Sequence, residues 1–297
     1  MRKTLAIVIL FLAAAGLHAQ DAASVAMPFS IVPRNVRTLS TGGLTTADAV
    51  AVRLLGDTGL DVNASWYSWA PQGASSNNIN ADAFVRLSNR LALSAQFGMD
   101  IAPRYDIYDA QGTKGGFYSP KDMLVKLGAA YRITPVISVG ADLRYMNSSL
   151  TSKVSYSAFG ADVIAAATFG GAKVAAGVTN LGTSVKASDG TAFGIPAAAT
   201  LAGKYNVSFA EKHSVDAGAQ VDFFFKGGLR AGLGVEYGFN GLVFARVGYS
   251  LGLNSPFPTY LSLGLGAKFS GISINAAYLV GSSAIGNTLA IGAGYSF

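Results

Sequence analysis

The sequence predicts an all-β fold, a transmembrane antiparallel β-barrel of about 14 strands, preceded by a short N-terminal segment. Composition is the first reason: 51% of residues are hydrophobic and 13% are charged, about half of the roughly 25% charged residues usual in soluble proteins. After the first 19 residues, no apolar run reaches the length that a membrane-spanning helix requires. From Leu60 onward, apolar and polar residues alternate in repeated segments, and a closed barrel is the β-structure that satisfies its backbone groups in lipid.

Residues 1–19 are predicted to be a secretory signal peptide, with a basic start, an apolar run at 5–17 and a cleavage site before Gln20. Removing Arg2 and Lys3 lowers the Lys and Arg count from 22 to 20 against 16 Asp and Glu, which leaves a net charge of about +4. This modest charge indicates no nucleic-acid partner. The chain has no cysteine, which excludes disulfides, lipid attachment and thiolate metal sites. We expect no cofactor and no metal.

Residues 20–59 are the least strand-like part of the chain, and we interpret them as a plug or a periplasmic segment. Thr45, with Asp48 three residues later, resembles a helix capping box. The stretch 47–55 predicts one short helix, and Gly56 is suited to end it. A flexible leader is the alternative interpretation, because chain termini are often disordered.

Residues 60–297 are predicted to form the barrel. Tight turns alternate with longer connectors, as in barrels with short periplasmic turns and long outer loops, and an even strand number places both termini in the periplasm. The segments that alternate over about the length of a tilted membrane strand are 60–68, 80–87, 91–100, 123–132, 137–146, 156–169, 172–179, 198–209, 213–225, 229–237, 242–250, 260–269, 272–280 and 289–297.

Charges occupy one parity of these segments and large apolar residues the other. A charge facing lipid at the midplane costs roughly 2 to 4 kcal/mol for Arg or Lys, so we assign the charged parity to the lumen. In a wide pore these groups would set ion preference, whereas in a narrow or plugged lumen they would pair with each other and with the plug; about fourteen strands favour pairing. The predicted lumen-lining residues are Arg86, Lys126, Asp142, Arg144, Asp162, Lys173, Lys204, Asp216, Asp222, Arg230, Glu236, Arg246 and Lys268.

Aromatic residues are predicted to form a girdle at each end of the barrel. At the periplasmic end they are Tyr131, Phe169, Phe209, Tyr237, Phe269 and Phe297. The last strand also resembles the C-terminal signal that barrel-assembly machinery recognises, and Gly292, Tyr295 and Phe297 carry that resemblance. The predicted surroundings are therefore outer-membrane lipid, reached through the assembly machinery of a Gram-negative bacterium.

The longest outer loop, 101–122, carries the aromatic residues Tyr105, Tyr108, Phe117 and Tyr118. They predict a contact surface for a partner or ligand, and a loop folded back over its own barrel mouth is equally compatible with them. Catalysis has little support. The mature chain has one histidine, His213, in a predicted tight turn, and the adjacent Ser214 would point to the opposite face of the strand. We therefore expect no enzyme.

The strand count, the N-terminal segment and the aromatic C-terminus together resemble the FadL-like outer-membrane barrel superfamily. The segment Arg37-x-Leu39-x-x-Gly42-Gly43 and the Gln after the signal look more like its PorV/PorQ branch in Bacteroidota. The Asn-Pro-Ala element of the family is missing, with Asn63-Ala64 as the nearest remnant. The resemblance implies either passage of small hydrophobic solutes or service as a barrel subunit or shuttle of a type IX-like secretion or assembly machine. A hydrolase centred on His213 is a third hypothesis.

Overall fold

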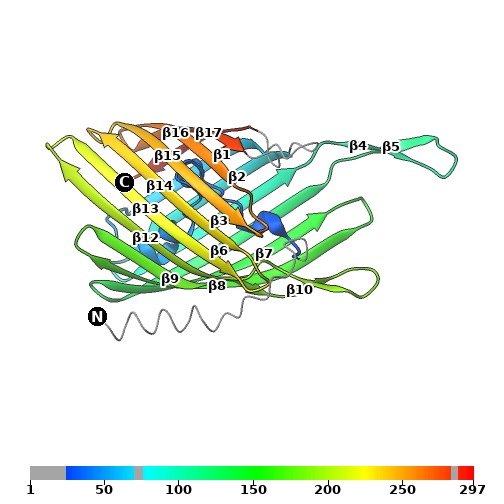
Figure 1. Ribbon diagram of the computed structural model, residues 1–297, viewed down its shortest axis with the longest axis horizontal. Helices are drawn as coiled ribbons and strands as arrows, with labels where there is room; N and C mark the ends of the chain where they lie inside the picture. The colour runs from blue at the N-terminus through cyan, green and yellow to red at the C-terminus, as the bar shows by residue number, and fades with distance from the viewer. Residues whose placement is uncertain (1–24, 70–75, 282–286) are drawn as a thin grey trace.

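The computed structural model describes residues 25–69, 76–281 and 287–297, so the predicted signal peptide lies outside the described residues. The described strands close into a 14-stranded antiparallel barrel (Figure 1). The fold prediction is therefore confirmed. The strands are β1 (Leu60–Trp69), β2 (Ser76–Arg86), β3 (Leu91–Ile101), β6 (Lys121–Thr134), β7 (Ile137–Ser149), β8 (Ser155–Phe169), β9 (Ala172–Gly182), β12 (Ala198–Phe209), β13 (His213–Phe224), β14 (Leu229–Phe239), β15 (Val243–Leu253), β16 (Tyr260–Phe269), β17 (Ile272–Gly281) and β18 (Thr288–Ser296).

The two ends of the barrel differ in their connections. One end, the short-turn rim, carries turns such as 135–136, 170–171 and 270–271, and also Phe297. The other end, the long-loop rim, carries the long connectors. Two of these connectors form small hairpins outside the ring, β4 (Tyr105–Tyr108) with β5 (Lys114–Tyr118) and β10 (Ser184–Lys186) with β11 (Ala192–Gly194). Figure 1 shows the β4–β5 hairpin extending beyond the rim.

The outer face of the barrel is apolar. Leu143 is 70% exposed, Leu265 is 66% exposed and Leu233 is 59% exposed, while Arg230 on the inner face is 2% exposed. All six aromatic residues predicted for the girdle at the short-turn rim are exposed. An exposed apolar surface of this extent is unfavourable in water and favourable in hydrocarbon.

The N-terminal segment, residues 25–59, contains four short helical elements: η2 (Pro28–Ile31), α2 (Val36–Ser40), η3 (Thr46–Asp48) and α3 (Val50–Leu54). No helix in the described part of the chain is long and apolar enough to cross a membrane. Asn35 caps α2, because its side chain accepts a hydrogen bond from the Arg37 amide.

A helix does lie within the predicted stretch 47–55, but it is shorter than predicted, α3 at Val50–Leu54, and the prediction of a Thr45 capping box is wrong. Ala49 adopts an extended ψ of 153°, which separates η3 from α3. Thr45 makes no side-chain cap; instead the wall residue Gln220 accepts a hydrogen bond from the Thr46 amide at 2.8 Å. Asp48 binds Thr38 and Lys204 rather than the helix start. Contacts with the barrel wall therefore override the local capping preference.

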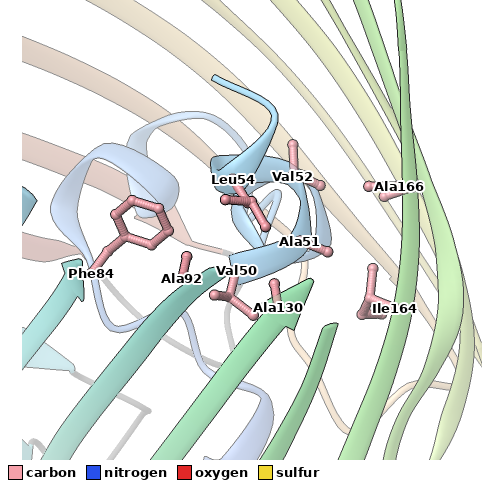
Figure 2. Close-up of a cluster of buried hydrophobic side chains, with 10 residues drawn as sticks. Val50, Ala51, Val52, Leu54, Phe84, Ala92, Ala130, Ile164 and Ala166 are labelled. Carbon is pink, nitrogen blue, oxygen red and sulfur yellow. The ribbon is translucent and has the colours of Figure 1, made fainter. Parts of the chain in front are cut away.

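Apolar packing places α3 against the barrel wall. Figure 2 shows Val50, Ala51 and their neighbours on α3 beside side chains of several strands. The buried cluster consists of Val50, Ala51, Val52, Leu54, Phe84, Ala92, Ala130, Ile164, Ala166 and Ala175. The wall residues in it are mostly alanine, and these small side chains leave room for a helix inside the barrel.

Wall glycines make room for the other half of the segment. Cβ atoms added at Gly232, Gly234 or Gly248 would fall within 3.0 Å of the backbone of Thr41 or Gly42. Gly42 itself has a φ of +73°, and a Cβ there would approach Leu233 and Tyr249 backbone oxygens equally closely. We call the wall residues Gly232, Gly234 and Gly248 the glycine cradle. Backbone therefore packs directly on backbone at this contact.

We expect Gly248→Ala to destabilise the folded chain by about 1 to 3 kcal/mol, because the new methyl group collides with backbone that cannot rotate away. The measurement is chemical unfolding of the protein in detergent micelles. Gly203→Ala is the matched control, since a Cβ on Gly203 meets no described atom within 4 Å. Equal stability of the two variants would show that the cradle does not hold the segment.

Candidate functional site in the barrel lumen

The N-terminal segment crosses the lumen from rim to rim. The Ala26 amide donates to the Gly194 carbonyl at the long-loop rim, and the Gly59 amide donates to Phe297 at the short-turn rim. The first described residues therefore lie at the long-loop rim. Residues 20–24, where the predicted mature chain begins, lie outside the described residues, so the periplasmic placement of both termini stays a prediction. The even strand number does bring Leu60 and Phe297 together, but the segment before Leu60 turns back through the barrel.

Arg34 is the most buried charge of the segment. Its guanidinium forms two hydrogen bonds with the Asp100 carboxylate on β3, at 2.5 and 3.1 Å, and donates to the Phe29 carbonyl at 2.9 Å. The Arg34 side chain is 1% exposed and the Asp100 side chain is 10% exposed. Such a paired geometry is what allows two charges to remain ionised in a buried site.

Arg37 joins the segment to the opposite part of the wall. It donates to both carboxylate oxygens of Glu236, at 2.9 and 2.6 Å, and lies 3.8 Å from Asp216. Arg246 on β15 donates to the same Glu236 and to Asn275. One buried carboxylate therefore holds two guanidinium groups, one from the segment and one from the wall.

Two further ion pairs lie on opposite sides of the strand ring. Asp48 accepts from Lys204 of β12 at 2.7 Å, whereas Arg53 lies 2.6 Å from Asp61 of β1 and 3.9 Å from Asp82 of β2. Burial on its own would raise the pKa of Asp48, but attraction to Lys204 and Arg37 holds that pKa well below its usual range. Ion pairs therefore join the segment to opposite sides of the barrel wall.

Wall side chains also satisfy backbone carbonyls in and just after α3. Arg132 donates to the Leu54 carbonyl, Arg86 to the Gly56 carbonyl, and Ser138 to the Ala51 carbonyl at 2.6 Å. The final carbonyls of a helix have no partner within the helix. In α3, the barrel wall provides donors for them.

The remaining predicted lumen residues bind each other, the segment or the strand ends, and Arg144 and Arg230 also donate to the Ser30 and Gly43 carbonyls of the segment. Lys126 lies 3.6 Å from Asp142, Arg230 lies 3.2 Å from Asp222, and Arg144 pairs with Asp162. Lys268 donates to the Ser296 hydroxyl at 2.7 Å. The Lys173 side chain makes no hydrogen bond or ion pair with the described residues.

Sequence reasoning missed Asp100 and the charges of the N-terminal segment. Asp100 shares the parity of Gln96 on the strand 91–100, which could have identified it as a lumen residue. Arg34, Arg37, Asp48 and Arg53 had no such periodic signal, because their segment contains no strand.

Between the segment and the wall lies a cavity of about 680 Å³. Charged and polar residues line much of it, among them Asp48, Arg53, Asp82, Lys126, Arg144, Lys173, Lys204 and Asp216. Toward the long-loop rim, an apolar cluster packs the start of the segment against the wall. This apolar seal consists of Met27, Phe29, Leu124, Met146, Ala158 and Ile195. The described lumen therefore combines a polar chamber with an apolar closure.

The predicted outer-loop residues divide into two pairs. The Tyr105 hydroxyl donates to the Leu150 carbonyl at 3.0 Å, and the Tyr118 hydroxyl lies 2.6 Å from the Ser149 hydroxyl. Both rings therefore fasten the β4–β5 hairpin to its neighbour. Tyr108 is 59% exposed and Phe117 is 62% exposed, with Arg104 over the Phe117 ring. These two rings remain available for contact.

The residues of the predicted assembly signal lie on the closing strand. Tyr295 and Phe297 are exposed, with ring centroids 6.1 Å apart, and Gly292 lies against Val36 of the segment. Recognition by assembly machinery stays a prediction.

His213 has no catalytic surroundings in the structure. Its Nδ1 atom lies 2.7 Å from the Tyr237 hydroxyl, and its ring contacts Phe209 and Phe239. Within the described residues, no group of three or more His, Cys, Asp or Glu side chains could hold a metal ion. The histidine therefore belongs to an aromatic cluster at the short-turn rim.

Comparison of the sequence with protein-family models and with curated proteins finds no match. Among solved structures, the chain is similar to the Ralstonia pickettii toluene transporter TbuX, with 14% identity, 90% of this chain and 99% of that chain covered, and a TM-score of 0.60. It is also similar to the P. putida toluene transporter TodX, with 12% identity, 90% of this chain and 98% of that chain covered, and a TM-score of 0.60. A third similar structure is the monoaromatic hydrocarbon channel CymD, with 11% identity, 90% of this chain and 97% of that chain covered, and a TM-score of 0.57. At these identities the likeness shows the fold.

We expect Arg34→Ala to destabilise the protein by about 3 to 5 kcal/mol, because it leaves the buried Asp100 carboxylate without its cation. Lys114→Ala removes a pair with Asp106 in the outer hairpin, where the side chains are 54% and 36% exposed, and should cost about 1 kcal/mol or less. Chemical unfolding in micelles measures both. Similar losses would contradict the structural role of Arg34.

The lowered pKa of Asp48 gives a pH prediction. Its charge stabilises the folded chain above the unfolded pKa of about 4, and this contribution is lost as pH falls through the lower folded value. We expect Asp48→Asn to lower the thermal midpoint by a constant amount from pH 5 to 7. Below about pH 4 the difference should shrink. A difference that persists at lower pH would rule out the ionised carboxylate as its cause.

Proposed function

We propose that this chain is a FadL-like outer-membrane barrel that passes small hydrophobic solutes across the membrane. The observation that carries the proposal is a closed barrel with an apolar outer face, whose lumen is occupied by its own N-terminal segment. The solute class is suggested by the names of the similar structures, which describe toluene transporters and a monoaromatic hydrocarbon channel. The segment would act as the plug.

The direction of the barrel is part of the proposal. We place the short-turn rim and Phe297 toward the periplasm and the β4–β5 hairpin outside the cell. A signal peptide at 1–19 and assembly through the C-terminal strand would deliver the chain to outer-membrane lipid.

A barrel subunit or shuttle in a secretion or assembly machine is the less favoured function. The exposed rings of Tyr108 and Phe117 are the feature that such a role would use. Membership of the PorV/PorQ branch would rest on the Arg37 to Gly43 segment, whose structural task is already explained by the Glu236 ion pair and the glycine cradle.

The proposed passage requires the segment to move, because its start closes the lumen at the apolar seal toward the long-loop rim. The Thr46 and Thr200 hydroxyl oxygens lie 2.8 Å apart, one on the segment and one on β12. Cysteines at both positions would be close enough for a disulfide, and the native chain has no cysteine to interfere.

We expect the oxidised Thr46→Cys/Thr200→Cys variant to lose uptake of radiolabelled toluene by cells that express it, and to regain uptake after reduction. The two single-cysteine variants are the controls, because they alter the same side chains without a link. Uptake by the oxidised variant at the unmodified rate would show that movement of the segment is not required. Wild-type uptake no faster than that of cells lacking the barrel, across a panel of hydrophobic solutes, would overturn the transport function.

A further inference from the structure

Lys173 is the exception in a lumen whose basic groups are otherwise bound. Among the basic side chains on the inner face, those of Arg86, Lys126, Arg132, Arg144, Lys204, Arg230, Arg246 and Lys268 each make a hydrogen bond or an ion pair. The Lys173 side chain makes neither with the residues that the structure describes. Its ammonium group is therefore the unmatched positive charge of this set.

The strand register adds electrostatic repulsion at Lys173. Lys204 of β12 stands directly opposite it across the ladder, and like charges at such positions destabilise a sheet. Lys204 is bound to Asp48 at 2.7 Å, so its own charge is matched. No equivalent acid lies within 4.0 Å of Lys173 in the described chain. An anion beside Lys173 would relieve this repulsion.

The site is open to small molecules. Lys173 lines the 680 Å³ cavity together with Thr168 and the turn Gly170-Gly171 at the short-turn rim. A Cβ on Gly170 would meet no described atom within 4 Å. The ammonium group of Lys173 lies beside Gly56, the residue that follows the end of α3. A Cβ atom added to Gly56 would be 2.9 Å from Lys173 Nζ. A bound group would touch both the wall and the end of α3.

The surrounding acids limit the charge of a ligand. Asp57 is exposed at the same mouth, and Asp216 is held by Asn206 at 3.0 Å and by Arg37 at 3.8 Å. These carboxylates and Asp48 would repel a dianion more strongly than a monoanion. One free ammonium group matches one negative charge, and its three N–H donors suit carboxylate oxygens.

We propose that Lys173 forms a binding site for a small monovalent carboxylate at the short-turn mouth of the lumen. The site does not depend on the proposed transport of hydrophobic solutes. It would also hold if the barrel served another function, because it follows from the charges and the cavity of this chain.

The test uses trifluoroacetate as the probe and follows its ¹⁹F NMR signal during titration with the full chain in detergent micelles at fixed ionic strength. We expect a saturable change of the signal with wild-type protein. Lys173→Met should weaken binding by about tenfold or more, and Lys173→Arg should retain it. Lys186→Met, at an exposed lysine of β10, is the matched control and should bind as wild type does.

Several outcomes would overturn the proposal. They are a signal that does not saturate, a Lys173→Met variant that binds as tightly as wild type, and a Lys186→Met variant that loses binding equally. Phosphate that displaces the probe more effectively than acetate would overturn the monovalent carboxylate as the ligand. Circular dichroism verifies the folding of each variant, and Lys173→Gln replaces Lys173→Met if the latter does not fold.

Discussion

The need to match charges inside a closed wall governs this structure. Fourteen strands put their apolar side chains outward, which leaves the charged residues on the inner face of a narrow lumen. Charges removed from bulk water require partners nearby. The N-terminal segment supplies many of these partners, since Arg34, Arg37, Asp48 and Arg53 each meet a wall residue of opposite sign. Wall and segment are therefore interdependent.

Shape complements charge at the same contacts. The glycine cradle admits the backbone of Thr41 and Gly42, and alanines on several strands admit α3. The lumen is left with a polar chamber on one side of an apolar seal. A hydrophobic solute would meet its favourable surroundings at the seal, whereas the chamber near Lys173 suits water and small ions.

The strands of the barrel could be predicted from the sequence, whereas the conformation of the N-terminal segment inside the barrel could not. Two-residue alternation is repeated in each strand, so it identified the strand spans and the inner parity of residues such as Arg144 and Glu236. The N-terminal segment has no comparable period. Its break at Ala49 depends on Gln220 and Lys204, which lie far away in the sequence and are brought close only by the closed barrel.

The tight enclosure of residues 25–59 bears on the order of folding. The barrel closes where β1, which directly follows the segment, pairs with β18 at the end of the chain. This pairing joins residues of very large sequence separation, so it forms slowly compared with the neighbouring hairpins. A segment whose backbone packs against wall glycines has little room to thread through a finished ring. Folding the wall around the segment, with the β1–β18 seam as the last step, avoids that obstacle.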